Sequence, residues 1–226
     1  MYFTKNALIV SMIALFFMGC DHDQASTVEK TPMLDFAVLN TEDGTYKTYS
    51  LPMPGKEHLQ ATEARTNAPQ SVTGTFHVYT GSYWDVAAIL NPSGIHGTTV
   101  VQSSAVGELT AEAVCVSTED GYATAAALIT SVGSYYYPWN PGVIFYFKYK
   151  DNGEGANAPP DQTSSIVFFI LNWYELYPSP EAFVADFPCQ YIDQAWYNYT
   201  LYNTSEGEYI DWGPYRDILD GNIKVK

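Results

Sequence analysis

Oxygen-donor side chains gather in one short segment between two apolar runs. Residues 150–165 read KDNGEGANAPPDQTSS, and they offer the donors Asp151, Asn152, Glu154, Asn157 and Asp161. Carboxylate and amide oxygens are the ligands that Ca²⁺ prefers in proteins. The spacing differs from that of an EF-hand loop, because Gly153 stands at the third position, where that loop needs a ligand.

The same segment suits a turn that needs no metal. An Asn-Gly pair at residues 152–153 favours positive φ, and a Pro-Pro pair at residues 159–160 ends strand pairing. Asp161 can accept hydrogen bonds from nearby backbone amides. We therefore predict an ordered turn over residues 151–161, and we expect no metal ligand and no cofactor in this chain.

Catalytic chemistry finds little support in the sequence. The four histidines are His22, His58, His77 and His96. None of them belongs to a zinc-protease motif, and no serine-hydrolase or β-lactamase motif accompanies them. Acidic residues are abundant, and whether two of them pair as acid and base depends on the fold. We predict no catalytic residue and keep an enzyme with carboxylate or tyrosine chemistry in a barrel cleft as an alternative.

Aromatic residues suggest a binding role. Residues 191–215 read YIDQAWYNYTLYNTSEGEYIDWGPY. Exposed Tyr and Trp rings would form a stacking platform for a sugar or a peptide, whereas packed rings would only hold a long connection against the domain. The candidate ligand-binding residues are Trp196, Tyr197, Tyr199, Tyr202 and Trp212.

A second candidate site is the alanine-rich hairpin over residues 109–129. Its small inward side chains could leave room for an apolar ligand inside a barrel. The alternative is that phenylalanine rings fill the space, as the close packing of protein interiors favours.

The first twenty residues indicate where the protein resides. Lys5 precedes an apolar run over residues 7–18 that is too short to span a bilayer and that ends at Gly19-Cys20. This pattern resembles a bacterial lipoprotein signal; an ordinary secretory signal is the alternative. We predict that residues 1–19 are a signal peptide and that Cys20 carries the lipid. The protein would face away from the cytoplasm on a membrane of the cell envelope, with the leaflet left open.

Two further cysteines, Cys115 and Cys189, remain in the exported part of the chain. An even pair in an oxidising compartment is more often bridged than free, so we predict a disulfide between them. Strand alternation places Cys115 on the same inward face as Leu109, Ala111 and Ala113.

Strand signals dominate from residue 71 onward. Short alternating segments separated by turn clusters predict an all-β domain over residues 71–226, built as a single antiparallel β-barrel or sandwich. One short helix is expected near residues 180–187, with Ser179 as its N-cap. Residues 20–70 look like a polar tether that contains a possible hairpin about residues 43–44; this hairpin either docks on the domain or stays isolated.

Several of these segments together resemble an uncharacterised family of small exported bacterial β-proteins. The resemblance rests on EAVCVSTEDGYATAAALIT, on a D-N-G-E-G…P-P-D loop and on a terminal G-N-x-x-V strand, and it covers residues 72–226. It implies a compact β domain and no catalytic residue.

The charge of the chain narrows its partners. Because the formal net charge is −15, we do not expect the protein to bind nucleic acid or anionic lipid surfaces through a basic patch. The function we expect is an envelope-anchored lipoprotein that acts as a non-enzymatic binding or interaction module. Its ligand would be a small molecule, a glycan or a protein, and its membrane contact would run through the N-terminal lipid. A purely structural envelope protein is a further alternative.

Overall fold

The fold is one antiparallel sheet with two short helices. The computed structural model describes residues 32–42, 44–53, 69–78, 82–104, 106–155, 157–189 and 213–226. They belong to a compact unit from Pro32 to Lys226, in which 13 strands form one sheet. The strands are β1 (Met33–Asn40), β2 (Tyr46–Pro52), β3 (Gln70–His77), β4 (Ser82–Asn91), β5 (Gly94–His96), β6 (Thr98–Ser103), β7 (Gly107–Glu119), β8 (Tyr122–Val132), β9 (Ile144–Lys150), β10 (Gln162–Ser164), β11 (Ile166–Ile170), β12 (Tyr215–Asp217) and β13 (Asp220–Val225). The predicted all-β antiparallel fold is confirmed.

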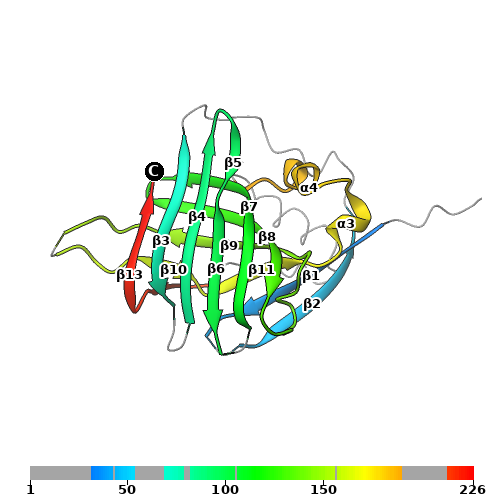
Figure 1. Ribbon diagram of the computed structural model, residues 1–226, viewed down its shortest axis with the longest axis horizontal. Coiled ribbons are helices and arrows are strands. Elements are labelled where there is room, and N and C mark those ends of the chain that lie inside the picture. Colours follow the sequence, from blue (N-terminus) through cyan, green and yellow to red (C-terminus); the bar gives the residue numbers. More distant parts are fainter. Residues whose placement is uncertain are drawn as a thin grey trace, which may run out of the picture. The chain divides into compact units, whose positions relative to one another are not determined.

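The sheet coils so that its two halves face each other (Figure 1). Its strand order is β13-β3-β4-β6-β7-β8-β9-β11-β1-β2. In Figure 1 the front layer, from β13 to β7, runs from top to bottom. The rear layer, which contains β9, β11 and β1, runs across the view behind it. Two register shifts in the β7–β8 pairing bend these long strands where the layers meet. The two layers therefore come from one continuous sheet, and this sheet does not close into the barrel that was one of the predicted forms.

Aromatic rings fill the space between the two layers. Trp84 on β4 stacks on Phe147 of β9 with ring centroids 4.9 Å apart, so this contact joins the front layer to the rear one. The indole Nε1 of Trp84 donates a hydrogen bond of 2.7 Å to Ser82 Oγ, which satisfies its one polar atom. The inward alanines of β7 and β8 lie in the same buried cluster as Phe76, Phe145, Phe147 and Phe169. Phenylalanine rings thus occupy the space that the alanines leave.

The two helices cover the outer face of the rear layer. They are α3 (Trp173–Leu176) and α4 (Pro180–Asp186), and α4 confirms the helix expected near residues 180–187. Ser179 caps α4 by accepting a hydrogen bond of 3.3 Å from the Ala182 amide. Phe183 of α4 and Trp173 of α3 pack on Phe168 and Ile170 of β11 in a second buried cluster. Strand β11 is therefore covered on both faces.

The predicted disulfide is present and ties the end of the α4 segment to β7. Cys115 and Cys189 are bonded, with their Cα atoms 5.9 Å apart. The prediction that Cys115 shares a face with Ala111 is wrong. A register shift between Ala113 and Cys115 reverses the alternation, so Cys115 packs with the second cluster under the helices.

The hairpin expected about residues 43–44 forms and docks on the domain. Strands β1 and β2 pair with each other, and β1 also pairs with β11 in the order Phe36↔Ile170 to Asn40↔Ile166. Gly44 has φ of +71°, which suits the turn between the two strands. The compact unit therefore begins at Pro32, well before the boundary expected at residue 71.

The loop over residues 151–161 caps backbone amides, as predicted. Asp161 Oδ1 accepts a hydrogen bond of 2.9 Å from the Asn152 amide, and its Oδ2 accepts one of 2.8 Å from the Ile223 amide on β13. Asp151 Oδ2 accepts a hydrogen bond of 3.1 Å from the Val225 amide on the same strand. Gly153 has φ of +89°, in the left-handed region expected for the Asn-Gly turn.

These two carboxylates therefore link the β9–β10 connection to the end strand of the sheet. They bind β13 on the edge opposite to β3, where a further strand would otherwise pair. Gly221 of β13 has φ of +110° and approaches the Thr75 carbonyl too closely for a Cβ atom. Two side chains, and not a backbone ladder, thus tie the outer edge of β13 to the β9–β10 connection.

Two buried tyrosines make the fold sensitive to alkali. Tyr146 donates a hydrogen bond of 2.7 Å to the Phe187 carbonyl. Burial raises the pKa of Tyr146 and that of Tyr149 above the ordinary value near 10. A raised pKa in the folded state favours folding fully below pH 10 and loses that contribution as the pH rises further. We expect the free energy of unfolding to fall by roughly 3 kcal/mol per pH unit above pH 10 for the two groups together.

Denaturant titrations at pH 8, 10 and 11 would measure this slope. The Tyr146→Phe variant should lose stability at pH 8 through its missing hydrogen bond, yet show a slope above pH 10 that is smaller by roughly 1.4 kcal/mol per pH unit. A variant slope equal to that of the wild type would contradict this role for Tyr146.

Candidate binding surface

The loop between β8 and β9 is held tightly along its length. Its sequence over residues 133–142 is GSYYYPWNPG. At its start the Gly133 amide donates a hydrogen bond of 2.7 Å to the Glu108 carbonyl, and at its end the Gly142 amide donates one of 2.8 Å to the Ile129 carbonyl. In between, Trp139 is only 6% exposed and stands edge-on to Phe169 with ring centroids 4.6 Å apart. The loop is thus fixed at both ends and in the middle.

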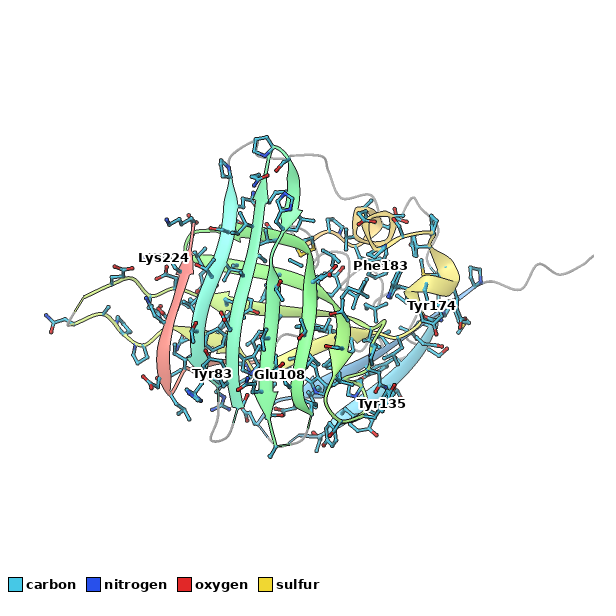
Figure 2. All side chains as sticks on the ribbon, in the orientation of Figure 1. Tyr83, Glu108, Tyr135, Tyr174, Phe183 and Lys224 are labelled. Carbon is cyan, nitrogen blue, oxygen red and sulfur yellow. A yellow bond between two sulfur atoms is a disulfide. The ribbon has the colours of Figure 1, made fainter. Side chains whose placement is uncertain are left out.

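Three consecutive tyrosines of this loop reach the surface. Tyr135 is 83% exposed, and Figure 2 shows it at the margin of the fold, below the β1–β2 hairpin. Tyr136 and Tyr137 are 42% and 39% exposed. Tyr46 on β2 is 49% exposed and lies against Tyr137, with ring centroids 5.1 Å apart and a tilt of 54°. We call these four residues the tyrosine patch.

A carboxylate lies beside the tyrosine patch. Partial burial raises the pKa of Tyr137, and the neighbouring Tyr46 and Asp35 raise this pKa further. The amide of Asn172 holds the Asp35 segment: its Oδ1 accepts a hydrogen bond of 2.8 Å from the Asp35 amide, and its Nδ2 donates one of 2.9 Å to the Met33 carbonyl. The surface therefore combines ring faces, phenol hydroxyls and one carboxylate.

Two hollows open elsewhere on the described part of the fold. One, of about 460 Å³, lies over the outer face of the front layer, between His77 of β3 and Glu108 of β7. The other, of about 340 Å³, lies next to the disulfide and includes Cys189, Tyr122 and Tyr215 in its lining. Tyr215 belongs to the aromatic segment of residues 191–215, and its ring lies 5.5 Å from that of Tyr122.

The residues predicted to bind ligand or lipid are not among those described. Trp196, Tyr197, Tyr199, Tyr202, Trp212 and Cys20 all lie outside the described residues. Of the two described histidines, His96 contacts Ser93 at 3.0 Å and His77 packs edge-on against Tyr83. Within the described ranges, no group of three or more His, Cys, Asp or Glu side chains is placed to hold a metal ion. No helix there has the length and apolar character needed to cross a membrane.

The tyrosine patch was not singled out by the sequence reasoning, although the sequence carries a signal for it. Tyr135, Tyr136 and Tyr137 are consecutive and precede a proline. Three adjacent rings cannot all point into one core from a turn, so some of them must face solvent. The contribution of Tyr46 could not be foreseen, because it depends on docking of the β1–β2 hairpin.

Comparison with protein-family models, with curated proteins and with solved structures gave no match. The resemblance of residues 72–226 to a family of small exported proteins therefore stays an expectation.

Proposed function

We propose that this protein is a lipid-anchored module of the bacterial cell envelope that holds an extracytoplasmic ligand on the tyrosine patch, without catalysis. The observation that carries the proposal is the exposure of Tyr135, Tyr136, Tyr137 and Tyr46 on a firmly anchored loop and its neighbouring strand. Tyrosine offers a large contact area and a polar tip with few rotatable bonds. Because the loop is already ordered, a ligand would not have to order it on binding.

Export to the envelope has separate support. The lipoprotein-like signal ends at Cys20, and the Cys115–Cys189 disulfide is of the kind that persists in oxidising compartments. A Cys20→Ala variant that still partitions fully with membranes would contradict the anchor.

The enzyme alternative has no comparable support in the described residues. Asp161 is a buried carboxylate, as a catalytic acid often is, but it accepts hydrogen bonds from the Asn152 and Ile223 amides. Both of its oxygens therefore serve the fold, and we assign it no catalytic role.

A binding screen with a matched variant tests the proposal. The full-length protein in detergent would be screened against arrays of glycans and peptides, beside the variants Tyr135→Ala and Tyr174→Ala. Tyr174 is 59% exposed and lies on α3, apart from Tyr135 in Figure 2. We expect Tyr135→Ala to weaken binding about tenfold and Tyr174→Ala to leave it unchanged. Equal effects of the two variants, or no bound member in either array, would refute the proposal.

A further inference from the structure

Four polar side chains form a row across the front layer. The strand register places His77 opposite Tyr83, Tyr83 opposite Gln102, and Gln102 opposite Glu108. Their sequence neighbours Phe76, Trp84, Val101 and Leu109 are buried in the core between the layers. Because successive side chains of a strand point to opposite faces, the four polar residues lie on the outer face of the sheet. We call them the outer row.

Members of the outer row contact each other and border a hollow. The His77 ring stands edge-on to Tyr83 with centroids 5.5 Å apart. Gln102 Nε2 donates a hydrogen bond of 3.0 Å to Glu108 Oε2. All four side chains line the hollow of about 460 Å³. The contacts within the outer row therefore hold its side chains in place, and these side chains form the floor of a hollow that is open to solvent.

The outer row continues toward the tyrosine patch. Glu108 accepts a hydrogen bond of 2.7 Å through its carbonyl from the Gly133 amide, and Gly133 begins the loop that carries Tyr135. Figure 2 shows Tyr83, Glu108 and Tyr135 in this order along one side of the fold. Three strand spacings separate His77 from Glu108, which gives a row of roughly 14 Å. A ligand that spans row and patch must therefore be an extended chain.

The chemical groups of the outer row indicate which kind of polymer could bind there. It offers an imidazole, a phenol, a carboxamide and a carboxylate, which are mixed donors and acceptors suited to hydroxyl groups. It holds no lysine or arginine, and the chain carries a net charge of −15, so an anionic polymer would be repelled. A basic peptide would favour a cluster of free acids, whereas the one carboxylate of the row, that of Glu108, already accepts a hydrogen bond.

We propose that the outer row and the tyrosine patch form one groove that binds an uncharged polysaccharide. The inference rests on the proposed function, because it takes the tyrosine patch as one end of the groove. The Tyr83 ring would lie against the apolar C–H face of a sugar, while Gln102, Glu108 and His77 would exchange hydrogen bonds with its hydroxyls.

Affinity electrophoresis of the full-length protein in detergent tests the groove. The probes are soluble neutral glucans, mannans and galactans, an anionic polyuronate and a lysine-rich peptide. The variants are Tyr83→Ala and Gln102→Ala, with Thr98→Ala as the control, because Thr98 is exposed on the same face of the same strand as Gln102. Circular dichroism would check the fold of each variant, and Gln102→Ala serves as the readout if Tyr83→Ala fails to fold.

We expect at least one neutral polysaccharide to bind, with about a tenfold loss in Tyr83→Ala, a smaller loss in Gln102→Ala and no change in Thr98→Ala. Failure of every neutral polysaccharide, or preferred binding of the polyuronate or the peptide, would overturn the inference. If Tyr135→Ala weakens binding and the row variants do not, the proposed function stands and the groove is refuted.

Discussion

Replacing Asp161 by alanine is expected to lower the free energy of unfolding by about 3 kcal/mol. The Asp161 side chain is buried, and its two oxygens accept the amides of Asn152 and Ile223 at 2.9 and 2.8 Å. Alanine would leave both amides without this partner in a place that water reaches poorly, and an unsatisfied buried donor costs about 1–3 kcal/mol. Asp161→Asn keeps one acceptor oxygen and should show a smaller loss. Chemical denaturation at pH 7 measures the free energy of unfolding of the wild type and of both variants.

Glu154→Ala is the control for this prediction. Glu154 lies in the same loop, but its side chain is 64% exposed and forms an ion pair with Lys224, at 2.6 Å. Exposed ion pairs contribute little, so stability should hardly change. Similar losses in Glu154→Ala and Asp161→Ala, together with a melting temperature that rises with calcium and falls with chelator, would show that the loop is a cation site.

Removal of the disulfide is expected to have the largest effect on stability. Cys115 and Cys189 are 74 residues apart in the chain, and in the chain-entropy model a bridge over such a loop stabilises the fold by about 4 kcal/mol. The double variant Cys115→Ala, Cys189→Ala should therefore melt about 10 °C below the wild type, because a domain of this size loses a few degrees per kcal/mol. Calorimetry under non-reducing conditions measures the difference.

Wild-type protein treated with a reductant provides the matched comparison. It should melt close to the double variant, and the reductant should leave the variant unchanged. A double variant that melts at the temperature of the untreated wild type would mean that the Cys115–Cys189 disulfide contributes nothing to the stability of the fold.

Local sequence pattern predicted much of the fold, and it failed where burial or register departs from simple alternation. The run SSIVFFIL over residues 164–171 carries no alternation that would orient it, since Val167 and Phe169 face the core between the layers while Phe168 and Ile170 face the helices. A strand buried on both faces carries no polar side to read. The predicted face of Cys115 was wrong for a different reason. A bulge changes which side chains of the strand point inward, and no residue type in the sequence marks it.

The candidate site was harder to predict than the fold. Three of the four residues of the tyrosine patch are adjacent in sequence, so most of the patch could be predicted from the sequence. Tyr46 is the exception. The outer row could not, because His77 and Glu108 come together only through the register of four strands. In the sequence alone His77 is an isolated histidine.

The topology of the sheet also sets the order in which it can fold. The β7–β8 hairpin closes through the short turn at Asp120-Gly121, whereas β3 must wait for β13, with Phe76 pairing opposite Gly221. Such distant pairings make folding slow, on the order of milliseconds to seconds. Until β13 arrives, the outer edge of β3 exposes unpaired backbone groups that could recruit another chain. We expect the net charge of −15 to limit such association, because mutual repulsion keeps incompletely folded molecules apart.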